Sequence, residues 1–312
     1  MSAPILPEQG PNRRPDGLPA ARGHLERLIG HYAELTGVAP DRVRRWVSVM
    51  VLLGALDRVG EEEMPRFLLK GGIAIELRFG TDARATKDVD LVFFGDPQVL
   101  EDDLDAAFDR DYSQFAFQRQ QIEQMPDTPF HRLSIKLLYR GRAWATLKLE
   151  VAPPDARGVD REPVPAIDIA EFGLDGPEVV QCLSTRFQVA QKIHAVTELF
   201  EDRENERFRD LIDLLLLREI VEDLSSLRDA CVVTFEARGK HGWPPQLSVP
   251  DSWAEPYRAL AGEMQFPVAD IDDAADDVRA LSPPSTLRRR RRDRAVHWTV
   301  PIQVRADWNR PC

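Results

Sequence analysis

The alternation of polar and apolar residues that ends at Phe93 is the feature that most constrains the fold. Asp88 and Asp90 alternate with Val89 and Leu91. Side chains on a strand point alternately to opposite faces, so one face is predicted to pack on a core while the two carboxylates share the other, about 6.6 Å apart. Two carboxylates so placed can bind divalent cations. Taken alone, such a pair is more often a solvated strand end.

A pair of glycines precedes this strand. Phe67 to Leu69 form a short apolar run, followed by Lys70, Gly71 and Gly72 and then by helix-forming residues from Ile73 to Phe79. Two glycines between a strand and a helix let the backbone approach a ligand closely and leave free amides at the helix N-terminus, where a phosphate binds. This arrangement favours a phosphate site beside the carboxylates.

A predicted hairpin supplies a third carboxylate. Residues 133–139 and 143–151 are strand-like and are separated by an Arg-Gly-Arg turn. Thr146, Lys148 and Glu150 form the polar face of the second run. Glu150 is therefore a candidate metal ligand from a strand next to the aspartate pair.

The chain changes character after residues 153–177, which are rich in proline, glycine and aspartate. Beyond them the pattern is helical, with expected helices over 184–200 and 207–220 among others. The predicted class is α+β, with an all-helical C-terminal region. The expected parts are a flexible arm over 1–20, a core over 21–160, a helical domain over 178–284 and a disordered Arg-rich tail over 285–312.

The charge is strongly uneven along the chain. There are 41 lysines and arginines against 52 acids, a net charge of −11. The tail has a charge of +6 and the remainder −17. This excludes a general nucleic-acid coat protein and allows only a local basic patch. No apolar run approaches the length of a membrane span and the N-terminus does not resemble a secretory signal, so we expect a cytoplasmic protein that does not enter a membrane.

Residues 68–94 resemble the signature of the AbiEii/AbiGii nucleotidyltransferase toxins, a family that includes the MenT-like toxins and belongs to the DNA polymerase β-like superfamily. In that signature a strand, two glycines and a helix precede R-x-(S/T)-x-D-x-D, matched here by Arg84, Thr86, Asp88 and Asp90. A second block, over 192–195 and 209–214, resembles the family's K-(hydrophobic)-x-A and R-D-x-x-D-L motifs. Gly72 stands where many relatives in the superfamily have serine, so no hydroxyl is available there for a phosphate.

The resemblance implies a polymerase β-like mixed sheet with helices, and a role for each matching residue. It implies that Asp88 and Asp90 bind Mg²⁺ and that Lys192 contacts the triphosphate. An acidic residue of the second block completes the site. Asp213 is favoured over Asp210, because it falls in an apolar stretch where an unpaired carboxylate would be costly. The expected nucleotide-binding residues are Lys70, Gly71, Gly72, Arg84, Thr86 and Asp210.

The implied function is Mg²⁺-dependent transfer of a nucleoside monophosphate from an NTP to an acceptor hydroxyl, with a tRNA 3′ end as the expected acceptor. The protein would be the toxin of a toxin-antitoxin or abortive-infection system and would be neutralised by a cognate antitoxin. Arg42, Arg44, Arg45 and the tail arginines are candidate RNA contacts. Two alternatives stay open. The acceptor could be a small molecule such as an antibiotic, or a protein hydroxyl, and the fold could serve a non-catalytic binding protein.

Overall fold

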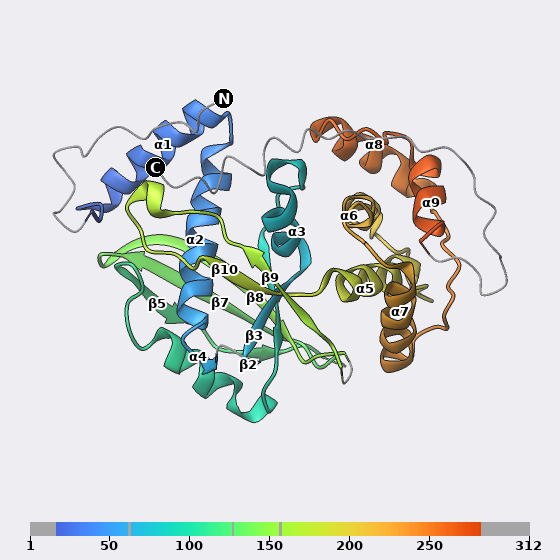
Figure 1. Ribbon diagram of the computed structural model, residues 1–312, viewed down its shortest axis with the longest axis horizontal. Helices are drawn as coiled ribbons and strands as arrows, with labels where there is room; N and C mark the ends of the chain where they lie inside the picture. Colours follow the sequence, from blue (N-terminus) through green and yellow to red (C-terminus); the bar gives the residue numbers. More distant parts are fainter. Residues whose placement is uncertain (1–16, 62–63, 127, 156–157, 282–312) are drawn as a thin grey trace.

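A computed structural model describes residues 17–61, 64–126, 128–155 and 158–281 (Figure 1). A mixed eight-stranded sheet forms its larger half, in the order β5-β7-β8-β4-β3-β10-β9, with β6 paired to β7. The β4–β8 and β3–β10 pairs are parallel and the others antiparallel. The strands are β3 (Phe67–Lys70), β4 (Asp88–Phe93), β5 (Phe115–Arg119), β6 (Glu123–Gln124), β7 (His131–Tyr139), β8 (Arg142–Ala152), β9 (Arg161–Pro165) and β10 (Val179–Leu183), and a separate pair is formed by β1 (Gly60–Glu61) and β2 (Met64–Pro65).

One face of the sheet packs against helices α1 (Arg22–Thr36), α2 (Pro40–Leu56) and α4 (Leu100–Phe108). Ile29 of α1, Met50 of α2 and Leu104 of α4 join Val89 and Leu91 of β4 in one buried cluster. The strand alternation seen in the sequence is confirmed, since these two β4 residues are fully buried while Asp88 is exposed. The acid-bearing face therefore lies opposite this core.

The second half is built from helices α5 (Thr185–Thr197), α6 (Phe208–Arg218), α7 (Leu224–Arg238), α8 (Ala254–Glu263) and α9 (Ile271–Arg279), which gather at one end of the sheet (Figure 1). They enclose their own apolar cluster, which Ile75 of α3 (Gly71–Phe79) also joins. Short 3₁₀ turns complete the structure: η1 (Gly80–Asp82), η2 (Pro97–Val99), η3 (Ala170–Phe172) and η4 (Asp251–Trp253). The predicted α+β class with C-terminal helices is confirmed.

The sheet extends beyond residue 160, where the predicted core ends. Strand β9 lies inside the proline-rich segment and pairs with β10, which in turn pairs with β3. The short β9 gives no long periodic pattern, because two of its five residues are prolines. We therefore propose that the core unit runs to Leu183 and that the helical unit begins with α5. Most of the predicted N-terminal arm and all of the predicted Arg-rich tail lie outside the described residues.

Among the residues that the structure describes, none of the helices combines the length and apolar character that a bilayer span requires.

Candidate active site

The carboxylates of β4 share one face with a neighbouring strand. The register of the parallel pair places Asp90 beside Glu150 and Asp88 beside Lys148 of β8. Lys70 of β3 lies beside Asp90 on the other side. Since register partners point to the same side of a sheet, one row across three strands carries Lys70, Asp90 and Glu150.

The two glycines bring this row against the start of α3. Gly71 has a φ of +68°, and a Cβ atom there would lie 2.0 Å from Asp90 Oδ2. A Cβ on Gly72 would lie 2.9 Å from the Cβ of Thr86. Both positions therefore exclude any side chain, and the absence of one lets Asp90 and Thr86 pack directly on the first turn of α3. The predicted proximity of Gly71, Gly72, Thr86 and Asp90 is present in the structure.

Burial controls the charge of this row. Desolvation raises the pKa of Asp90, and the carboxylates of Glu150 and Asp88 add to that effect, whereas Lys70 and Lys192 oppose it. Desolvation also lowers the pKa of Lys70, whose ammonium lies 5.6 Å from the centre of the Phe130 ring. A nearby cation stabilises the ionised form of such a buried carboxylate, which burial alone disfavours.

Glu150 is held by another residue. Its Oε2 atom accepts hydrogen bonds from Arg132 Nε at 3.1 Å and from the terminal nitrogen Nη2 of Arg132 at 3.0 Å. Within the described residues, no group of three or more His, Cys, Asp or Glu side chains is arranged to hold a metal ion. The predicted ligand set of Asp88, Asp90 and Glu150 is thus not assembled. The aspartate pair still fits Mg²⁺, because this ion usually takes one or two carboxylates together with substrate phosphates.

A buried ion-pair network faces this row from the helical half. Lys192 Nζ on α5 donates to Asp210 Oδ1 and to Asp213 Oδ2 on α6, each at 2.7 Å. The side chains of Asp210, Asp213 and Lys192 are 5%, 1% and 12% exposed. Burial lowers the pKa of Lys192, but the two carboxylates outweigh it and the pKa is raised overall. Lys192 thus remains charged and acts on Asp90 as a cation.

Arg84 joins the two halves of the molecule. It comes from the loop before β4, and its Nε and Nη2 atoms donate to the two oxygens of Asp213 at 3.0 and 2.8 Å. Burial raises the pKa of Asp213, but Lys192 and Arg84 more than compensate and lower it overall. Both residues were predicted to serve the nucleotide or the chemistry directly. In the structure Asp213 is the shared counter-ion of two cations, and Arg84 is bound to it.

The predicted RNA contacts of α2 are only partly available. Arg42 donates to Glu76 Oε1 at 2.5 Å and to the carbonyls of Gly80 and Ala83 at 3.0 and 2.7 Å. The guanidinium of Arg42 is thus used to anchor the loop after α3, and its contact with RNA stays a prediction. Arg44 lies 3.5 Å from Glu26 Oε1 and 5.5 Å from the centre of the Trp144 ring.

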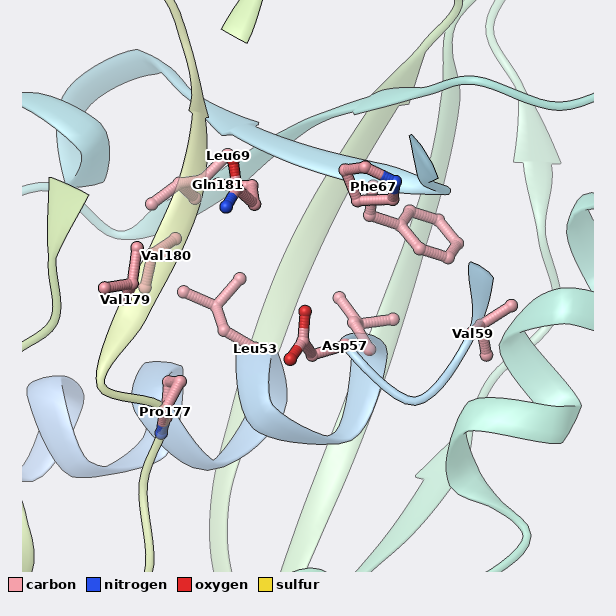
Figure 2. A pocket seen from close by; sticks show the side chains of 11 residues that line it. Leu53, Asp57, Val59, Phe67, Leu69, Pro177, Val179, Val180 and Gln181 are labelled. Carbon is pink, nitrogen blue, oxygen red and sulfur yellow. The ribbon is translucent and has the colours of Figure 1, made fainter. Parts of the chain in front are cut away.

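A separate recess lies on the other face of the sheet. Figure 2 shows it between the end of α2 and strands β3 and β10, lined by Leu53, Asp57, Leu69 and Val180 among others. Leu69 belongs to the core face of β3, so the recess is separated from Asp90 by the sheet itself. Its volume of about 30 Å³ suits a water molecule and not a nucleotide.

Sequence reasoning missed Arg132 and the full basic surroundings of the acids. The register places Arg132 beside Glu150, and Lys136 beside Thr146, on the same face as the aspartates. The available signal was the alternation of β7, whose buried positions are Leu133, Ile135, Leu137 and Tyr139.

Comparison with known proteins points to one family. Residues 54–282 match the family model described as nucleotidyl transferase AbiEii toxin, type IV toxin–antitoxin system. A search of curated proteins found no match.

Solved structures were compared as well. MenT4, a nucleotidyltransferase toxin of Mycobacterium tuberculosis H37Rv, is 18% identical with a TM-score of 0.50, over 82% of this chain and 97% of that one. The antibiotic-resistance factor ANT(2'')-Ia is 16% identical with a TM-score of 0.36, over 62% of this chain and 92% of that one. At these identities the likeness to MenT4 supports the fold alone.

Proposed function

The chain belongs to the AbiEii family of nucleotidyltransferase toxins, and from this premise we propose that it transfers a nucleoside monophosphate from an NTP to the 3′-hydroxyl of a tRNA, with Mg²⁺ as cofactor. The observation that carries the proposal is the meeting of the two halves at Asp90. Asp90 of β4 lies against the first turn of α3, and Lys192 acts on Asp90 from α5. This is the arrangement that a bound triphosphate needs, with acids for a metal and a cation for the leaving phosphates.

Each residue has a defined task in the proposed reaction. Asp88 and Asp90 would hold Mg²⁺, which supplies charge neutralisation at the phosphates. The amides of Gly71 and Gly72 would bind phosphate oxygens at the start of α3, with Thr86 and Lys70 beside them. Lys192 would stabilise the charge that develops on pyrophosphate as the acceptor oxygen bonds to the α-phosphorus. The hydroxyl proton passes to solvent.

We assign Asp213, Asp210 and Arg84 to positioning. Two carboxylates on α6 fix the ammonium of Lys192, and Arg84 ties Asp213 to the loop that leads into β4. An ammonium has three N–H donors, and two of those on Lys192 are used by the carboxylates. The third N–H therefore has a fixed direction. Arg84 and Asp210, predicted to contact the nucleotide, are thus proposed to position Lys192 instead.

The biological role follows from the family. We propose that the protein is the toxin of a type IV toxin–antitoxin pair and that a cognate antitoxin opposes its activity. Asp88→Asn should then relieve growth arrest on expression without antitoxin, because it removes one of the two charges that hold the metal. Asp109→Asn, at an exposed position just after α4, is the matched control and should stay toxic.

The direct test is label transfer with purified protein. Each labelled NTP is incubated with Mg²⁺ and total RNA, and in parallel with an aminoglycoside and with lysate protein. The proposal predicts label in the tRNA size range, lost in Asp88→Asn and on chelation. Label on the aminoglycoside or on protein would instead establish the corresponding alternative acceptor. No transfer to any of the three by the unmodified chain would refute the proposed activity.

A further inference from the structure

The polar face of the sheet continues past the aspartates with lysines. On this face, Asp88 of β4 lies beside Lys148 of β8, which lies beside Ser134 of β7. One step further along the strands, Thr146 lies beside Lys136. Neighbouring strands are about 4.8 Å apart, and diagonal neighbours on one face lie about 7 to 8 Å apart. Lys148 is thus adjacent to Asp88, and Lys136 is the next cation along a diagonal. We call these two lysines the lysine patch.

The lysine patch is accessible and its charges are not used within the fold. Lys148 is exposed and Lys136 is half-buried. Within the residues that the structure describes, neither ammonium has a carboxylate within ion-pair distance. Arg132, in contrast, is paired with Glu150 in the row of Asp90. The patch therefore presents two positive charges without an ion-pair partner on a protein whose net charge is −11.

The neighbours of the patch are small or neutral. Ser134, Thr146 and Gln118 surround the two lysines in the register, and Asp88 is the acid that shares their rows in the described strands. The other acids of this face, Glu150 and Glu123, lie in or next to the row of Asp90. A cationic acceptor would meet repulsion here, whereas a polyanion would be attracted and led towards the aspartates.

We propose that the lysine patch binds the phosphodiester backbone of the RNA strand whose 3′-hydroxyl is placed at Asp88 and Asp90. This inference rests on the proposed function and names the surface that holds its acceptor. Lys148 contacts the phosphate nearest the 3′ end, and Lys136 contacts a phosphate further upstream. Lysine–phosphate contacts fix register without reading bases, so the patch holds an RNA strand irrespective of its sequence.

The test uses the full chain with Lys136→Gln and Lys148→Gln together. Lys240→Gln, at an exposed position beyond α7, is the matched control. RNA binding is measured with a fluorescently labelled, short single-stranded RNA without NTP, over a range of salt concentrations. Transfer is then measured as KM for RNA and, separately, KM for NTP. Thermal unfolding of each variant checks that the fold is retained.

The expected result is a weaker RNA affinity with a shallower salt dependence. Two lost phosphate contacts should reduce the slope of log K against log salt by about 1.4, at about 0.7 per contact with a single strand. KM for RNA should rise while KM for NTP stays within error, and Lys240→Gln should behave as the unmodified chain.

Three results would overturn the proposal. An unchanged RNA affinity and salt slope in the double variant would show that the patch does not bind RNA. The proposed function would be unaffected by this result if the unmodified chain still transferred label to tRNA. A rise in KM for NTP alone would place the lysines at the triphosphate. If neither the unmodified chain nor the double variant bound RNA, the proposed role of the lysine patch would be rejected. Label transfer to another acceptor would in that case also replace RNA as the acceptor in the proposed function.

Discussion

Substituting Asp213 by asparagine tests how the two halves of the molecule are held together. The side chain is 1% exposed and accepts from Arg84 at 3.0 and 2.8 Å and from Lys192 at 2.7 Å. Asparagine has nearly the same shape but no charge, so two buried cations lose their shared counter-ion. Removing one partner of a buried ion pair costs about 3 to 5 kcal/mol, out of a total stability of about 5 to 15 kcal/mol for a domain.

The assay is urea unfolding followed by circular dichroism, with the free energy of unfolding extrapolated to water. Asp276→Asn is the control, because Asp276 is 78% exposed and its ion pair with Arg279 should contribute less than about 1 kcal/mol. Asp210→Asn should fall between the two, since Asp210 accepts one charged hydrogen bond, from Lys192. A loss below about 1 kcal/mol for Asp213→Asn would show that this carboxylate does not hold Arg84 and Lys192 in place.

Three further predictions follow from particular contacts. Gly71→Ala places Cβ 2.0 Å from Asp90 Oδ2 at a φ of +68°, so label transfer should be abolished while helical content is kept; active protein would contradict the packing described. Burial lowers the pKa of His194 from 6.5 to about 4, so the unfolded chain protonates first as the pH is lowered; the free energy of unfolding should fall by up to about 3 kcal/mol from pH 6.5 to pH 4, a decrease that His194→Phe should reduce. Arg42→Gln should destabilise the fold by about 3 kcal/mol, because buried Glu76 loses its cation and keeps only the hydrogen bond from Trp46, with RNA affinity unchanged.

The acid-bearing strand was predictable because its signal is local. Alternation from Asp88 to Leu91 sets which of these side chains are buried, whereas Val92 is buried although it shares the face of the aspartates. The same holds for Gly71 and Gly72, because the residues directly before and after them indicate the change from strand to helix. The likeness of the two blocks to a known family extended this to Lys192 and to the second-block acids, and the structure brings Lys192, Asp210 and Asp213 together.

The partners of the charged residues were not predictable in the same way. Arg84 and Asp213 are 129 positions apart, and Arg42 and Glu76 are 34 apart. Each arginine had several carboxylates within plausible reach in the sequence. Because Glu76 and Asp213 are buried, each needs a cation as partner. The packing of α2 on the loop after α3 determined the partner of Glu76, and the packing of α6 against the loop before β4 determined that of Asp213.

Period and residue type along the chain were sufficient to establish the sheet with one acidic face, the glycine turn beside it and the helical second half. Tertiary structure alone decided that Glu150 is bound by Arg132, that Asp213 serves two cations, and that Lys136 and Lys148 continue the face of the aspartates. The physical reason is the range of the interactions. Backbone geometry imposes its period on neighbouring residues, whereas a buried charge is satisfied by whichever opposite charge the folded chain brings within about 3 Å.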